Sequence, residues 1–108
     1  MKRTSGYRRR ADVNHVEILD AFRRLGCTVT DLRLVGRGCP DALIGYRGID
    51  HQVEVKKPRG PKAKAEDRKP TQVTYAATWK GQPPAIVRTV EDVEQLVHQW
   101  NIPKGIQP

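Results

Sequence analysis

Apolar and polar positions repeat with different periods along the chain, and the longer period predicts helices. From Asp12 to Leu25 the apolar residues recur every three or four positions, as on one face of a helix, and Gly26 ends the pattern. A second stripe with this spacing follows Thr89, which predicts a helix that starts with a capping box. This stripe consists of Val93, Leu96, Val97 and Trp100.

Segments rich in Val, Ile, Thr and Leu lie between these two helices and predict strands. They cover residues 27–34, 41–46, 51–57 and 84–88. The short link 47–50 predicts that the second and third strands form an antiparallel hairpin. A further helix is expected over 71–80, before Gly81, and a charged loop over 58–70. The order α-β-β-β-α-β-α predicts an α/β domain with a mixed four-stranded sheet flanked by helices.

The length of 108 residues corresponds to one domain, since domains typically hold about 100 to 150 residues. We expect residues 1–11 to form a flexible basic arm, residues 12–100 the domain and residues 101–108 a frayed tail. No apolar run approaches the roughly 18 residues of a membrane span, and no apolar segment follows the basic N-terminus as in a secretory signal. We therefore expect a cytoplasmic protein without a membrane partner, in the host cytoplasm if the protein is viral.

The charge balance indicates the kind of partner. Twenty Lys and Arg residues against twelve Asp and Glu residues give a net charge of +8, which favours a polyanion through phosphate contacts. The excess gathers in the first ten residues and between 56 and 69, in clusters that either bind phosphate or are solvated tails and loops. Cys27, Cys39 and the three scattered His residues lack metal-binding spacing, so we expect free thiols and no zinc site.

Charged residues interrupt two of the predicted strands in a way that burial does not explain. Because strand side chains alternate between faces, Val53 and Val55 point to one face, while Glu54 and Lys56 point to the other. On a paired neighbouring strand, Asp41 can reach the face of Glu54. A Glu-x-Lys on a wet strand face and an Asp after Pro are each common without a function. Their combination at hairpin spacing, in a basic chain, favours a functional site.

Two carboxylates beside an ammonium group can share one hard cation. Mg²⁺ takes oxygen ligands and commonly binds one or two carboxylates together with substrate phosphate oxygens, so Asp41 and Glu54 are the predicted ligands. The main-chain carbonyl of Val55 is a predicted third ligand. Such an ion acidifies a water molecule, and Lys56 would hold or deprotonate this water or stabilise the pentavalent phosphorus. Burying two carboxylates without a cation is costly, which also favours a metal.

Pro40-Asp41 followed by Glu54-Val55-Lys56 resembles the signature of the PD-(D/E)XK nuclease superfamily. The fuller pattern resembles small stand-alone phage-type VRR-NUC proteins and spans residues 12–97. It consists of a helix with Asn14 and Glu17, then Gly36-x-Gly38-x-Pro40-Asp41, Glu54-Val55-Lys56, and Gln72 on the next helix. The resemblance implies a restriction-endonuclease-like core, a requirement for Mg²⁺ or Mn²⁺, and hydrolysis of DNA phosphodiester bonds.

The resemblance also implies roles for single residues. Asp41 and Glu54 would be catalytic metal ligands and Lys56 the residue that activates water. Glu17 matches an additional helix acid that is linked to the metal through water, and Gln72 matches a glutamine that positions Lys56 or the phosphate. Stand-alone members look like homodimers that cut branched DNA such as four-way (Holliday) junctions, where a two-fold dimer would present two active sites. The long loop 58–70, and Lys-Pro-Thr before Gln72 in place of a clear helix cap, depart from the pattern.

The remaining candidate residues have alternative roles. Glu17 and Gln72 are site residues or exposed helix residues, and Asn14 bridges local backbone rather than contacting substrate. Tyr75, Trp79 and Trp100 are typical of core or interface aromatics rather than of base-stacking platforms. The candidate phosphate contacts are Arg8, Arg9, Arg10, Arg37, Lys57, Arg59, Lys62 and Lys64.

Two other functions are compatible with the sequence. The first is a non-catalytic nucleic-acid-binding protein that uses the same basic surface without a metal. The second is a structural or assembly protein that packs through Trp100 and the last helix. The acid pair separates the first from a nuclease, because cleavage depends on Asp41 whereas passive binding does not. The salt dependence of binding separates the second from a nuclease, because the DNA affinity of a nuclease falls steeply with salt, whereas an assembly protein self-associates independently of salt and has no DNA affinity.

Overall fold

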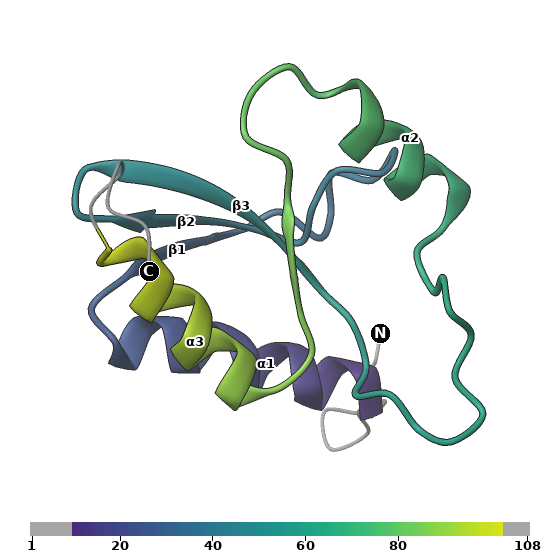
Figure 1. The fold of residues 1–108 in the computed structure, drawn as a ribbon, viewed down its shortest axis with the longest axis horizontal. Helices are drawn as coiled ribbons and strands as arrows, with labels where there is room; N and C mark the ends of the chain where they lie inside the picture. Colours follow the sequence, from purple (N-terminus) through teal and green to yellow (C-terminus); the bar gives the residue numbers. More distant parts are fainter. Residues whose placement is uncertain (1–9, 103–108) are drawn as a thin grey trace, which may run out of the picture.

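The computed structural model describes residues 10–102, with side chains from residue 13 onward (Figure 1). Along the chain it forms α1 (Arg10–Arg24), β1 (Thr28–Asp31), β2 (Ala42–Tyr46), β3 (Ile49–Val55), α2 (Pro70–Thr78), β4 (Ala85–Val87) and α3 (Val90–Trp100). The predicted arm and tail lie mostly outside the described residues. The helix α1 begins at Arg10, two residues before the predicted Asp12.

The four strands form one mixed sheet in the order β1-β2-β3-β4. The pairs β1–β2 and β2–β3 are antiparallel, and β3–β4 is parallel. The β2–β3 hairpin turns on Arg47 and Gly48, whose φ angles of 51° and 83° are those of a type I′ turn. The parallel pair requires a crossover, which is made by α2 and the long segments on both sides of it. The expected single α/β domain with a mixed four-stranded sheet is confirmed.

The apolar core lies between the sheet and the helices α1 and α3, which cover the same face (Figure 1). Its fully buried side chains include Ile18, Phe22, Ile44, Val53, Val87 and Val93. Trp100 closes one end of this core, because its ring stacks on the buried His51 at 3.7 Å between centroids and lies 6.0 Å from that of Phe22. This is the core role expected for Trp100.

Local signals set the ends of the helices. After α1, Gly26 adopts φ 90° and the Cys27 N–H donates to the Phe22 carbonyl at 3.1 Å, a Schellman ending. At the start of α3, the Thr89 hydroxyl accepts from the Asp92 N–H at 3.1 Å, and the Asp92 carboxylate accepts from the Thr89 N–H at 3.2 Å. The predicted capping box is therefore confirmed.

All four strands are predicted, but two of them differ from the predicted bounds by more than one residue at an end. The first strand, predicted over 27–34, ends at Asp31, and the last bond toward β2 is from the Leu32 N–H to the Asp41 carbonyl. Beyond this bond the chain turns away from β2, as the Val35 N–H donates to the Leu32 carbonyl at 3.0 Å. The third strand, predicted over 51–57, is Ile49–Val55, because the hairpin needs only two turn residues.

Helix α2 lies on the opposite side of the sheet from α1 and α3 (Figure 1). It starts at Pro70 rather than at the predicted residue 71, since proline suits the first helical position. All of its residues are described, and none is buried. Tyr75 and Trp79 stack at 5.1 Å between ring centroids, and the Tyr75 hydroxyl donates to the Gln52 side chain on β3. Among residues 10–102, no helix has the length and apolar content of a membrane span.

Candidate active site

The β2–β3 hairpin brings Asp41 and Glu54 to opposite positions on neighbouring strands. Ala42 pairs with Val53, so Asp41, which directly precedes Ala42, faces Glu54 across the ladder. Side chains at such positions have Cβ atoms about 4.5 to 5.5 Å apart. Ala42 and Val53 are fully buried in the core, so the two acids belong to the other face of the sheet, the face on which α2 lies. This is the alternation that the sequence predicted.

Glu54 is a buried carboxylate without hydrogen-bond partners among the described residues. Its exposure is 3%, and neither carboxylate oxygen has a hydrogen-bond partner within residues 10–102. The Lys56 ammonium lies 3.9 Å from one of these oxygens, beyond hydrogen-bond distance. Burial, and then the charge of Asp41, raise the pKa of Glu54 to about 7, against smaller opposing effects that include the charges of Lys56 and Arg68. Two oxygens held in this way are suited to a cation.

The main chain of β3 holds Asp41 in place. One Asp41 carboxylate oxygen accepts a hydrogen bond from the Val55 N–H at 2.7 Å. Asp41 is half-buried, and it lines the same cavity as Val55 and Lys56. The predicted set of two carboxylates and the Val55 carbonyl therefore comes from one short stretch of two paired strands.

Lys56 is fixed at both its main chain and its side chain. Its N–H donates to the Val87 carbonyl on β4 at 3.0 Å, and its carbonyl accepts from the Asn14 amide on α1 at 3.1 Å. Its ammonium donates to the Gln72 side-chain oxygen at 2.8 Å. The Asn14 contact differs from the expected bridge to local backbone, because it reaches main chain 42 residues away, at Lys56 itself. Gln72 lies against Lys56 rather than on open surface.

The Gln72 oxygen has a second donor, the Lys69 N–H at 2.8 Å. Lys69 is the residue before α2, so Gln72 acts as the third-position half of a capping box. This explains how the helix starts without a Ser, Thr, Asp or Asn before Pro70. The signal was present in the sequence as a glutamine three residues after Lys69, but it carries weight only once the helix start is known.

Glu17 is not joined to the other candidates. It is exposed on α1, one turn after Asn14, and no hydrogen bond or ion pair links it to Asp41, Glu54 or Lys56 within the described residues. Its role as an additional site acid stays a prediction.

Two hollows open beside the acid pair. The larger has a volume of about 340 Å³ and is lined by Asn14, His15, Arg33, Asp41, Val55, Lys56, Lys57 and Lys69. The smaller lies between the sheet and α2 and is lined by Gly38, Pro40, Glu54, Arg68, Gln72, Ala76, Pro84 and Ile86. Asp41 thus faces the larger, basic hollow and Glu54 the smaller one, with Lys56 and Gln72 between them.

The donor set fits a hard divalent cation, although it is small. Within residues 10–102 no group of three or more His, Cys, Asp or Glu side chains could hold a metal ion. An ion bound here would rely on Asp41, Glu54 and a main-chain oxygen, and would complete its shell with water and phosphate oxygens. Mg²⁺ is commonly bound by one or two carboxylates in this way, which also disfavours a soft metal. The unpartnered Glu54 oxygens carry this fit.

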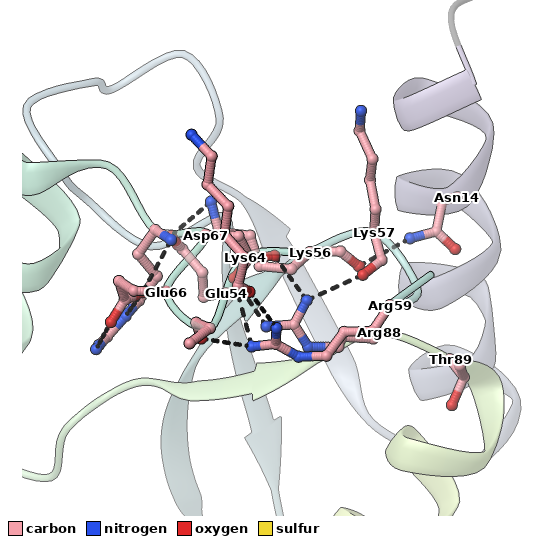
Figure 2. A network of polar contacts seen from close by, with 12 residues as sticks. Asn14, Glu54, Lys56, Lys57, Arg59, Lys64, Glu66, Asp67, Arg88 and Thr89 are labelled. Carbon is pink, nitrogen blue, oxygen red and sulfur yellow. Dashed lines mark hydrogen bonds and ion pairs between the residues drawn. The ribbon is translucent and has the colours of Figure 1, made fainter. Parts of the chain in front are cut away.

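The basic residues of the loop between β3 and α2 fall into two groups (Figure 2). Arg59 donates to the carbonyls of Lys64 and Ala65 at 2.5 and 3.0 Å, so its guanidinium holds the loop together. Lys57, Lys62 and Lys64 are exposed, and their side chains form no ion pair within the described residues. The lysines are better placed than Arg59 to contact phosphate.

The remaining phosphate-contact candidates lie elsewhere. Arg37 is exposed and sits between Gly36 and Gly38 with φ 59°. Arg8 and Arg9 lie outside the described residues, as does the side chain of Arg10. The sequence prediction missed Arg33 and Lys69, which join Lys57 around the larger hollow. No short-range pattern identifies them, because the fold brings them together.

Comparisons of the chain with protein-family models, with curated proteins and with solved structures found no match.

Proposed function

We propose that this protein is a metal-dependent DNA endonuclease of the PD-(D/E)XK type, with a restriction-endonuclease-like fold and Mg²⁺ or Mn²⁺ as its cofactor. One observation carries the proposal. Glu54 is buried, and neither of its carboxylate oxygens has a hydrogen-bond partner within residues 10–102, although Asp41 lies opposite it on the paired strand and the Lys56 ammonium is 3.9 Å away. A chain that only folds or only binds anions has no use for this costly arrangement.

The residues have distinct roles in the proposed reaction. Asp41, Glu54 and the Val55 carbonyl would hold the ion, which when bound supplies an acidified water and neutralises negative charge. Lys56 donates hydrogen bonds to the attacking water or to a phosphate oxygen, because Gln72 holds its ammonium at the edge of the acid pair. Glu54 must be ionised to bind a cation, so the proton that its raised pKa retains near neutral pH leaves when the site is loaded.

The surroundings suit a polyanionic substrate. Arg33, Lys57 and Lys69 line the hollow into which Asp41 opens. Lys57 and Lys69 can hold the phosphates on either side of the bond that is cut, whereas the Arg33 guanidinium is paired with the Asp31 carboxylate at 2.9 Å. The net charge of +8 favours encounter with DNA. The preference for branched DNA such as four-way junctions, and a homodimer that presents two sites, are parts of the proposal that rest on the family resemblance alone.

A cleavage assay tests the proposal. Wild type and Glu54→Gln are incubated with linear, flapped and four-way-junction DNA in Mg²⁺, Mn²⁺ or EDTA. We expect wild type to cut at least one substrate with metal and none in EDTA, and Glu54→Gln to be slower by about 1,000-fold. Glu91→Gln is the matched control, because Glu91 is an exposed acid on α3, and it should cut like wild type.

Two results would contradict the proposal. If wild type cuts nothing with either metal, the protein is not this nuclease. If wild type and Glu54→Gln both bind DNA without cutting it, the non-catalytic binding protein is the better description. Undiminished cutting by Glu54→Gln would instead remove Glu54 from the site.

A further inference from the structure

Helix α2 carries a site residue but has no apolar anchor. None of its side chains is buried, in contrast to α1 and α3. Its contacts with the rest of the protein include Gln72 with Lys56, Tyr75 with Gln52, and the Thr71 carbonyl close to Gly38. The loop between β3 and α2, which leads into the helix, therefore has to help fix the position of the helix.

That segment is fastened by Arg88, which lies between β4 and α3 (Figure 2). The Arg88 guanidinium donates two parallel hydrogen bonds to the Asp67 carboxylate at 2.7 and 2.8 Å. The same guanidinium donates to the Lys57 carbonyl at 3.0 Å. Arg88 thus binds the first residues of the loop and a residue three positions before Pro70, so it fixes the two ends of the loop relative to each other.

Arg88 is itself held rigidly. It directly follows β4, and its N–H donates to the Asp92 carboxylate at 2.8 Å, the same carboxylate that caps α3. Its side chain is 15% exposed and that of Asp67 30%, so the pair is more shielded than an ordinary surface ion pair. A bidentate guanidinium–carboxylate contact fixes orientation as well as distance. The loop is therefore tied to the packed part of the domain and not only to itself.

We propose that Arg88 and Asp67 are positioning residues that set the place of α2 and so keep Gln72 against Lys56. Neither touches the acid pair directly. They act through the chain from Asp67 to Lys69 and then through Gln72, whose side-chain oxygen accepts from both the Lys69 N–H and the Lys56 ammonium. The catalytic consequence rests on the proposed nuclease function, while the placement of α2 does not.

Asp67→Asn is the variant that tests this proposal, and Glu66→Gln is its matched control. Glu66 is the adjacent acid and pairs only locally with Arg68 at 2.8 Å, so its loss removes the same charge without releasing the loop from Arg88. We expect hydrogen exchange of the α2 amides to quicken about 10-fold in Asp67→Asn, and to stay within about twofold of wild type in Glu66→Gln.

Cleavage kinetics give the second readout. With the DNA substrate that wild type cuts, we expect kcat of Asp67→Asn to fall about 10-fold while KM stays within about twofold, because Lys56 loses its orientation but the basic surface is intact. Arg88→Lys keeps the charge but loses the fork, and should resemble Asp67→Asn. The double variant Asp67→Asn/Arg88→Lys should be slowed by less than the product of the two single effects, since both substitutions break the shared Asp67–Arg88 contact. The two effects need not be identical, because Asp67 also pairs with Arg59 at 3.9 Å and Arg88 also holds the Lys57 carbonyl.

The proposal is overturned if Asp67→Asn matches Glu66→Gln in both exchange and kcat, or if the two substitutions add fully in the double variant. Failure of the nuclease proposal looks different. In that case wild type cuts no DNA, and the exchange of the α2 amides still decides whether Arg88 and Asp67 place the helix.

Discussion

The two faces of the sheet are built from the same strands and have opposite characters. On the face covered by α1 and α3, Ala42, Ile44 and Val53 are completely buried among apolar side chains. One residue away on the other face stand Asp41 and Glu54, beside Lys56. The first face is closed by two packed helices, whereas the second is covered only by α2, which buries no side chain.

This difference separates the face of the sheet that stabilises the fold from the face that carries the proposed active site. The apolar face contributes favourable burial, while the burial of Glu54 opposes ionisation and therefore costs stability near neutral pH. A charged residue at a buried strand position that gains no compensating packing or hydrogen bonds is a candidate for a functional residue.

Truncating the apolar face should have the largest effect on stability. Phe22 is fully buried and its ring lies 6.0 Å from that of Trp100, so Phe22→Ala should lower the free energy of unfolding by about 3 to 5 kcal/mol. Urea denaturation measures this. Cleavage per folded molecule should be close to wild type at a temperature where the variant is folded. A loss of cleavage that exceeds the loss of folded protein would show that the two faces are not separate.

The pH dependence of stability should expose the cost of the polar face. Glu54 has a pKa of about 7 in the folded protein against an ordinary 4.5, so the folded state holds the extra proton between these values. The free energy of unfolding should therefore be greatest below pH 4.5, as far as Glu54 is concerned, and fall by about 3 kcal/mol as pH rises through 7. Denaturation in EDTA between pH 5 and 8 should show this fall in wild type but not in Glu54→Gln. Equal slopes in both proteins would contradict it.

The sequence could predict the contrast between the faces, because it follows from the two-residue period of a strand. Val53 and Glu54 are neighbours in the chain, so their opposite environments are local information. The helix endings were equally local, as Gly26 and the Thr89–Asp92 capping box show. The helices and strands themselves could be predicted for the same reason, because the period of apolar residues is also local information.

What the sequence could not predict depends on contacts between distant segments. Arg88 and Asp67 are 21 residues apart and belong to no periodic pattern, so nothing marks them as partners. Helix α2 buries no side chain, so no packing pattern predicts where it lies, and only the family resemblance pointed to Gln72 as a site residue.

Gly38 lies where the polar face of the sheet meets α2. Substitution of Gly38 by alanine should therefore impair the protein more than the same substitution at Gly36. Gly38 has φ 80°, and a Cβ there would overlap the Thr71 carbonyl; Gly36 has φ 75° but nothing nearby. Gly36→Ala should cost about 1 to 2 kcal/mol of stability through strain alone and leave cleavage unchanged. Gly38→Ala should also displace α2 and lower kcat. Equal kcat in the two variants, measured with the same DNA, would show that this contact does not position the helix.

The exposed lysines should have the smallest individual effects. Lys62 is exposed and has no ion pair within the described residues, whereas Arg59 is bound to loop carbonyls. If Lys62 contacts a phosphate, Lys62→Gln should weaken DNA binding a few-fold and lower the slope of log affinity against log salt by about 0.9. Arg59→Gln should change that slope less. Fluorescence anisotropy over a range of salt concentrations tells them apart, and an unchanged slope for Lys62→Gln would remove it from the interface.

On the proposed function, Glu54 is buried to bind a cation and not to stabilise the fold. Thermal unfolding at pH 8 of wild type and Glu54→Gln, in EDTA and in Mn²⁺, distinguishes these two reasons for its burial. In EDTA, Glu54→Gln should unfold at the higher temperature, since it buries no charge. Mn²⁺ should raise the Tm of wild type, because an ion that binds only the folded state stabilises it, and should leave that of Glu54→Gln unchanged. A Glu54→Gln protein that is less stable than wild type in EDTA and equally stabilised by Mn²⁺ would contradict the claim.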